Sequence, residues 1–187
     1  GGMRFDLQWE ATPPPRLPLD LLVGLPRPQT ARRVLFEAAF QGARRLSFFG
    51  AERGEPSYRA SKLWHTDEWQ RHLWSGAEQA FHTSLPEVCH WPDLPTALGA
   101  LAARKSAPET CLALDVYEGT MRLSAVLRET PAAPCLALGP ERGWSPRERN
   151  HLRASGYRLV TLGERVLKVE SAVTAAMTLA RAALGEC

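Results

Sequence analysis

Residues 134–145, with the sequence PCLALGPERGWS, decide the fold class of this chain. The apolar run Pro134–Leu138 predicts a buried strand, because such a run is typical of a strand covered on both faces. The glycines and proline of Gly139–Gly143 predict a loop directly after that strand. A helix is expected to follow from about Ser145 to Ala154.

Residues 158–172, with the sequence RLVTLGERVLKVESA, repeat this order of elements. Arg158–Leu162 predicts a second strand, and Gly163 predicts the turn that ends it. A final helix is expected from about Glu170 to Leu184. The last third of the chain therefore predicts strand, loop and helix twice in succession.

The same alternation extends toward the N-terminus, although less clearly. It predicts strands at Leu19–Leu25, Leu46–Phe49, Val88–His90, Cys111–Leu114 and Leu123–Leu127, and helices at Thr30–Gly42, Ser61–Phe81 and Leu94–Arg104. The expected fold class is α/β, with a mostly parallel sheet and helices on both faces. Ligands of such sheets bind beyond the carboxyl ends of the strands, where Gly139–Gly143 and Gly163–Lys168 are two of the expected loops.

The length of 187 residues, with 44% hydrophobic and 23% charged residues, fits one globular domain. No apolar run approaches the roughly 18 residues of a membrane span, so we expect a cytoplasmic protein without a membrane partner. Gly1 and Gly2 resemble the remnant of a cleaved tag. We expect residues 1–16, which include Pro13–Pro15, to form an extended lead-in, and residues 17–187 to form the domain.

Composition and spacing also limit the chemistry that is expected. The four cysteines lie far apart and form no C-x-x-C pair, so no metal site is expected. The net charge of +3 allows an anionic partner without requiring one. Arg53 and Arg59 lie in the charged stretch from Gly50, and a solvated surface is favoured there over contact with phosphates.

Two motifs carry a resemblance to a known family. Residues 139–145, GPERGWS, resemble the G-P-E-G-G-F/W-S motif of the RsmE-type 16S ribosomal RNA uridine-N3 methyltransferases. Residues 162–172, LGERVLKVESA, resemble that family's L-G-x-R-I-L-R-x-E-T-A motif. The two motifs occur in the family's order, and the resemblance covers roughly residues 17–187.

The resemblance implies a SPOUT fold, in which the C-terminal segment forms a deep trefoil knot. It implies S-adenosylmethionine as the cofactor, ribosomal RNA as the substrate and a homodimer with the site near its interface. We expect no counterpart of the family's small N-terminal RNA-binding barrel, because the 16 residues before Leu17 are too few to form one. One face of the final helix carries small and apolar residues, which suits a knot, a dimer contact or a plain core: Ala172, Val173, Ala176, Met177 and Ala180.

The resemblance also implies roles for individual residues. The cofactor-binding candidates lie in the two motifs: Leu138, Gly139, Glu141, Gly143, Leu162, Gly163, Val166 and Leu167. Arg165 and Lys168 are the candidate cations for a developing uridinate, and Glu170 is the candidate proton acceptor. Glu170 has an equally good role at the start of a helix, where a carboxylate favours the helix dipole.

Several positions depart from the family pattern: Arg142 replaces a glycine, Lys168 an arginine, Ser171 a threonine, and Phe40 and His82 stand where a glutamate and an arginine are expected. Arg142, like Lys168, is a candidate contact for RNA, but its side chain has an alternative place inside the cofactor pocket. The main hypothesis is a methyltransferase that modifies a uridine N3 of small-subunit ribosomal RNA. The alternatives are an inactive SPOUT domain that binds RNA or protein, and an active enzyme with another RNA target.

Overall fold

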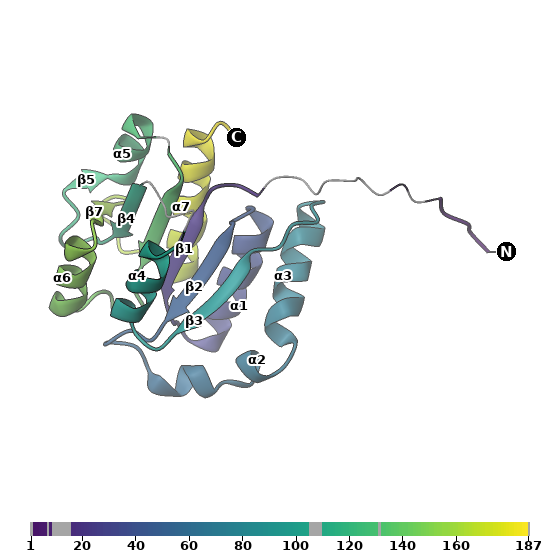
Figure 1. Cartoon of the computed structure of the whole chain (residues 1–187), viewed down its shortest axis with the longest axis horizontal. Coiled ribbons are helices and arrows are strands. Elements are labelled where there is room, and N and C mark those ends of the chain that lie inside the picture. Colours follow the sequence, from purple (N-terminus) through teal and green to yellow (C-terminus); the bar gives the residue numbers. More distant parts are fainter. Residues whose placement is uncertain (1, 7, 9–15, 105–109, 131, 187) are drawn as a thin grey trace.

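Parallel strands form the centre of the molecule. In the computed structural model, which describes residues 2–6, 8, 16–104, 110–130 and 132–186, seven strands form one sheet in the order β3-β2-β1-β6-β4-β7-β5. Every neighbouring pair of these strands runs parallel (Figure 1). The predicted α/β class with a parallel sheet is confirmed. Pro13–Pro15 of the expected lead-in lie outside the described residues.

The elements follow one another in a nearly regular alternation. The strands are β1 (Asp20–Gly24), β2 (Arg45–Phe49), β3 (Glu87–Trp91), β4 (Thr110–Leu114), β5 (Met121–Arg122), β6 (Pro134–Leu138) and β7 (Arg158–Thr161). The helices are α1 (Pro28–Phe40), the 3-10 turn Pro56–Ala60, α2 (Lys62–His65), α3 (Glu68–Gln79), α4 (Leu94–Ala102), α5 (Leu123–Glu129), α6 (Pro146–Ala154) and α7 (Val169–Ala183).

Helices cover both faces of the sheet, as predicted. Leu21 and Val23 of β1 pack into a core with α1, α3, α5 and α7, whereas Leu22 between them packs into a second core with α4 and α6. Successive side chains of a strand point to opposite faces, so each strand of the sheet's centre contributes to both cores. Figure 1 shows α1, α3 and α7 on the side of the sheet opposite α4 and α6.

Helix α7 contributes its small residues to the first of these cores. Val173, Ala176, Met177 and Ala180 are fully buried, and the helix contacts α1, α5 and β6. The small, apolar face of this helix, for which a knot, a dimer contact or a plain core was expected, thus packs against other elements of the same chain. No described helix is long and apolar enough to cross a membrane.

The strand predicted at Leu123–Leu127 is wrong, because this stretch is helix α5. Its buried residues Leu123, Val126 and Leu127 have the i, i+3, i+4 spacing of a helix face. A short apolar run does not distinguish a strand from a buried helix. The strand is instead β5, whose two residues precede the helix.

The single helix predicted over Ser61–Phe81 is also wrong, because the chain breaks between α2 and α3. Thr66 is extended (φ −130°, ψ 179°). Its hydroxyl donates to the Lys62 carbonyl and accepts the Glu68 N–H, so one side chain satisfies backbone groups of both helices. The remaining predicted elements are present, although α1 begins at Pro28, two residues before the predicted start at Thr30.

The strand order reverses between β1 and β6. From β1 the chain continues through α1 to β2, and from β6 it continues through α6, on the opposite face, to β7. In open α/β sheets the crevice at such a reversal is the usual ligand site. The backbones are close there, since a Cβ on Gly24 would lie 2.8 Å from the Pro140 ring.

Candidate functional site

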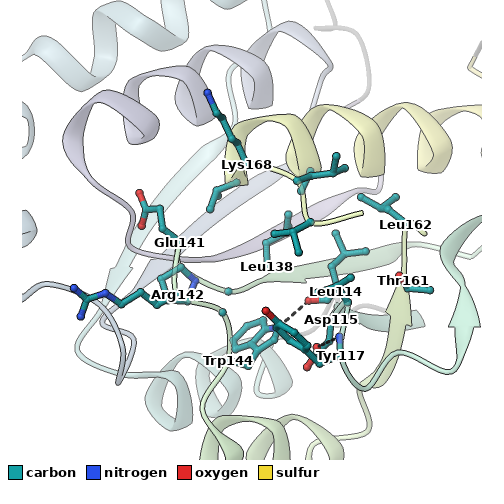
Figure 2. A pocket seen from close by; sticks show the side chains of 18 of the residues that line it. Leu114, Asp115, Tyr117, Leu138, Glu141, Arg142, Trp144, Thr161, Leu162 and Lys168 are labelled. Atoms are coloured by element: carbon teal, nitrogen blue, oxygen red, sulfur yellow. Dashed lines mark hydrogen bonds between the residues drawn. The ribbon is translucent and has the colours of Figure 1, made fainter. Parts of the chain in front are cut away.

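A cavity of about 590 Å³ lies beyond the carboxyl ends of β4, β6 and β7. It is bounded by the loops that follow these strands, by the start of α7 and by Arg27 and Thr30 near the start of α1. Its volume falls in the usual range of small-molecule sites. Figure 2 shows the side chains that surround it.

The loop after β6, residues 139–145, forms one wall of this cavity. Gly143 has a φ of +67° and donates its N–H to the Pro140 carbonyl, so the loop is a tight turn that favours glycine. A Cβ on Gly139 would lie 3.3 Å from backbone atoms of Gly143 and Trp144. At Gly139 and Gly143 no side chain covers the backbone of this wall, so its polar groups are accessible from the cavity.

Two residues fix where this loop ends. The Trp144 indole donates to the Leu114 carbonyl (2.8 Å) and stacks on Phe49, with ring centroids 5.9 Å apart. Ser145 caps α6: its hydroxyl accepts the Glu148 N–H, and the Glu148 carboxylate accepts the Ser145 N–H. This capping box is worth about 1 kcal/mol and sets the start of the helix.

The loop after β7 forms the opposite wall. The Thr161 hydroxyl donates to the Gly163 carbonyl (2.6 Å) and accepts the Gly163 N–H (3.0 Å). Gly163 itself has a φ of +140°. Beyond this turn Val166 and Leu167 remain 73% and 43% exposed while lining the cavity. Exposed apolar side chains beside a cavity are typical of a ligand site.

The candidate catalytic residues lie in the loop after β7 and in the first turn of α7. Arg165 and Lys168 line the cavity with exposed side chains, and neither forms an ion pair within the described residues. The side chain of Glu170 is mostly buried and accepts a hydrogen bond from Arg33 of α1 (3.0 Å). The Glu170 carboxylate is therefore held in place from outside the cavity.

Arg142 does not fill the cavity. Its side chain is exposed and extends away from Leu138 and Leu114 (Figure 2). The neighbouring Glu141 accepts the backbone N–H of Arg27 (3.0 Å), which joins the β6 loop to the loop after β1. The Arg142 side chain therefore lies outside the cavity, where it is available to RNA, and not inside the cofactor pocket.

The loop after β4 contributes residues that sequence reasoning missed. Asp115 is buried, and its carboxylate accepts the backbone N–H groups of Tyr117 and Glu118 (2.8 and 3.3 Å) and hydrogen bonds from Arg149. The hydrogen bond to Asp115 raises the pKa of the Arg149 guanidinium. Asp115 thus ties α6 to the loop that carries Tyr117 into the cavity wall.

One signal in the sequence could have identified Asp115. A polar residue that directly follows an apolar strand of a parallel sheet lies at the ligand-binding edge, and Asp115 follows Cys111–Leu114 in this way. Arg149 had no such signal, because an arginine inside a polar helix is ordinary. Tyr117, which is 76% exposed, and Trp144 are the aromatic residues that line the cavity.

All the site residues expected from the two motifs line this one cavity: Leu138, Gly139, Glu141, Arg142, Gly143, Leu162, Gly163, Arg165, Val166, Leu167, Lys168 and Glu170. They come from two loops about 20 residues apart that the sheet brings together. Among the described residues no group of three or more His, Cys, Asp or Glu side chains is arranged to hold a metal ion.

Known proteins share this sequence pattern. The family model of the RNA methyltransferase domain matches residues 13–181. Ribosomal RNA small subunit methyltransferase E of Treponema pallidum is 35% identical over 167 residues, covering 85% of this chain and 60% of that protein. Its counterpart in Synechocystis is 30% identical over 171 residues, covering 90% and 54%. The chain thus spans little more than half the length of these relatives.

Solved structures share the fold. A ribosomal RNA small subunit methyltransferase E from Neisseria gonorrhoeae, bound to S-adenosyl methionine, has a TM-score of 0.73 at 23% identity, covering 89% of this chain and 66% of that chain. The SpoU methyltransferase AviRb from Streptomyces viridochromogenes has a TM-score of 0.61 at 16% identity, covering 89% and 59%. The family model and the curated relatives confirm the resemblance carried by the two motifs: this chain belongs to the RNA methyltransferase domain family, among RsmE-type relatives.

Proposed function

We propose that this protein is an S-adenosylmethionine-dependent methyltransferase that modifies a uridine N3 of small-subunit ribosomal RNA. One observation carries the proposal: both family motifs and the β4 loop line a single cavity beyond the carboxyl ends of β4, β6 and β7. The relatives that match most of the chain are named as methyltransferases of this RNA.

The residues of the cavity fit the proposed cofactor. Gly139 and Gly143 leave backbone groups accessible for hydrogen bonds to a nucleoside, and Gly163 does the same on the opposite wall. Leu138, Leu162, Val166 and Leu167 offer apolar contacts for an adenine ring, and Glu141 lies at the cavity edge as an acceptor for a ribose hydroxyl. When bound, S-adenosylmethionine supplies an electrophilic methyl group.

The loop after β7 and the first turn of α7 supply the groups that prepare the nucleophile. The uridine N3 must lose its proton to attack, and the negative charge then spreads over the ring. Arg165 and Lys168 would stabilise this charge, and Glu170, oriented by Arg33, would accept the proton. Orientation and exclusion of water are the main contributions of a protein to such a transfer.

Arg142 and Lys168 are proposed to contact the RNA. Their exposed side chains stand at the mouth of the cavity, where a phosphate backbone would pass. The outward direction of Arg142 leaves the cavity open, which favours an active enzyme over an inactive binding domain (Figure 2).

We also propose the C-terminal trefoil knot, a homodimer and a cytoplasmic location. The knot is supported by the resemblance of the two motifs to the RsmE-type family and by the family match over residues 13–181. Chain tracing in a crystal structure tests the knot, and sedimentation equilibrium tests the homodimer. A monomer at all concentrations would contradict the second of these.

Calorimetric titration with S-adenosylmethionine and S-adenosylhomocysteine is the first test of function. We expect micromolar affinity that is lost in Gly139→Trp, because even a Cβ at this position lies 3.3 Å from backbone atoms of Gly143 and Trp144, so an indole would displace the β6 loop that forms the cavity wall. Nucleoside analysis of ribosomal RNA treated with the protein and the cofactor then identifies the methylated position. No heat of binding at millimolar cofactor would overturn the methyltransferase and favour the inactive binding domain.

A further inference from the structure

The loop after β2, residues 50–59, is fastened to the cavity wall by Glu52. The Glu52 N–H donates to the Glu148 carboxylate (3.0 Å), and the Ser145 hydroxyl donates to the Glu52 carboxylate (2.5 Å). Glu148 is itself fully buried within the capping box of α6. These bonds hold the β2 loop against the β6 loop, far from it in sequence.

This anchoring places Arg53 beside the cavity. Its exposed guanidinium donates to the backbone carbonyl of Arg142 (3.3 Å), in the loop that lines the cavity. Arg59 of the same β2 loop is engaged elsewhere, because its guanidinium donates to the Trp91 carbonyl at the end of β3. Of these two arginines, Arg53 is therefore the one presented at the cavity mouth.

Cationic side chains outnumber unpaired carboxylates at the mouth of the cavity. Exposed arginine and lysine side chains from four loops gather there without an ion pair in the described part of the chain: Arg27, Arg53, Arg142, Arg165 and Lys168. Of the carboxylates nearby, Glu170 pairs with Arg33 and Glu52 pairs with Arg147. Glu141, which accepts the backbone N–H of Arg27, and the exposed Glu164 remain, so five cations face two unpaired carboxylates in the described part of the chain. Like charges held close together repel, so this arrangement favours a bound polyanion.

We propose that Arg53 binds a backbone phosphate of the RNA strand next to the target nucleotide. This inference rests on the proposed function, since the strand reaches Arg53 only when its target base enters the cavity. A base that is to be methylated at N3 must leave its pair, so the strand at the mouth is locally single-stranded. The planar guanidinium suits a phosphate, and the contact positions the strand without reading its sequence.

The test uses the whole chain and a transcript of small-subunit ribosomal RNA, with binding measured over a range of salt concentrations. Arg53→Ala is expected to lower affinity about three- to fivefold at low salt and to reduce the slope of log K against log salt by about 0.7 to 0.9, as for one lost phosphate contact. Arg53→Lys should keep the slope. Arg158→Ala is the matched control, because Arg158 is exposed at the opposite end of the sheet, where β7 begins.

Other outcomes separate this inference from the proposed function. Equal effects of Arg53→Ala and Arg158→Ala on RNA binding, or no effect of either, would overturn the phosphate contact and leave the methyltransferase standing. A matching loss of cofactor affinity in Arg53→Ala would show that Arg53 only supports the β6 loop. If the wild-type protein bound the cofactor and poly-glutamate but not RNA, the proposal of an RNA partner would be overturned in favour of an acidic protein.

Discussion

At the scale of single residues, the buried pair of Asp115 and Arg149 supports the cavity wall. Asp115→Asn keeps the shape of the side chain but leaves the Arg149 guanidinium, also buried, without its main counter-charge. Breaking such a pair costs about 3 kcal/mol of unfolding free energy. Urea denaturation of the two proteins measures the difference.

Glu118→Gln is the control for this prediction. Glu118 also approaches Arg149 (3.4 Å), but its side chain is 42% exposed, so its loss should cost less than about 1 kcal/mol. Equal losses in the two variants would contradict the assignment of Asp115 as the supporting charge.

Two glycines in different surroundings give a second prediction at this scale. In Gly24→Ala the new methyl group would meet the Pro140 ring at 2.8 Å, where β1 and the β6 loop meet, and we expect a loss of about 1–3 kcal/mol. In Gly99→Ala the methyl group meets nothing within 4 Å, inside α4, so a gain of about 0.5–1 kcal/mol is expected. Chemical denaturation distinguishes the two. A gain in both variants would mean that β1 and the β6 loop can separate without cost.

At the scale of elements, periodicity predicted well wherever a run was long or was bounded by glycine or proline. Strands β1, β2, β3, β4, β6 and β7 and helices α4, α6 and α7 lie close to their predicted positions. The run Leu123–Leu127 failed because its five residues fit either a helix or a strand. The break at Thr66 was not predicted, because a threonine that forms hydrogen bonds to the backbone on both sides has no periodic signature.

The candidate site was predictable to the extent that its residues follow strands in sequence. The two motif loops were found because glycines and family order mark them. The contributions of Asp115, Arg149 and the Glu52 anchor could not be found in this way, since they depend on which loops the sheet brings together. Contacts between residues distant in sequence are fixed by strand order, which periodicity does not provide.

The attachment of strand β3 provides a prediction about pH. Glu87 accepts hydrogen bonds from Arg104 (3.0 and 3.1 Å), just after α4, and from Arg45 of β2 (3.2 Å). The Arg104 hydrogen bond lowers the pKa of Glu87 below its ordinary value. The stabilisation is therefore present above the ordinary carboxyl pKa and is lost as the pH falls through the lowered value.

Glu87→Gln should accordingly be less stable than wild type near neutral pH, by less than about 1 kcal/mol because the carboxylate is half exposed. The difference should vanish as Glu87 becomes protonated in acid. Urea denaturation across this pH range measures it. A difference that stays constant with pH would show that the charge of Glu87 contributes nothing.

At the scale of the whole molecule, the cavity joins segments within residues 114–172 to Arg27 and Thr30 near the start of α1. Three strand loops and the start of α7 share its walls, so a ligand bound there contacts all of them at once. Global unfolding must then release the ligand, and the ligand's binding free energy adds to the stability of the fold.

This coupling predicts a large thermal shift. At a concentration of S-adenosylmethionine about 100 times its Kd, the fold gains about 2.7 kcal/mol, which for a chain of this size raises Tm by about 5–10 °C. Gly139→Trp should show no shift. Val166→Asp, altered at an exposed position of the same cavity, should show a reduced shift with an unchanged Tm in the absence of cofactor. Differential scanning fluorimetry measures all three proteins. An equal shift in all three would place the bound cofactor outside this cavity, because neither altered side chain would then touch it.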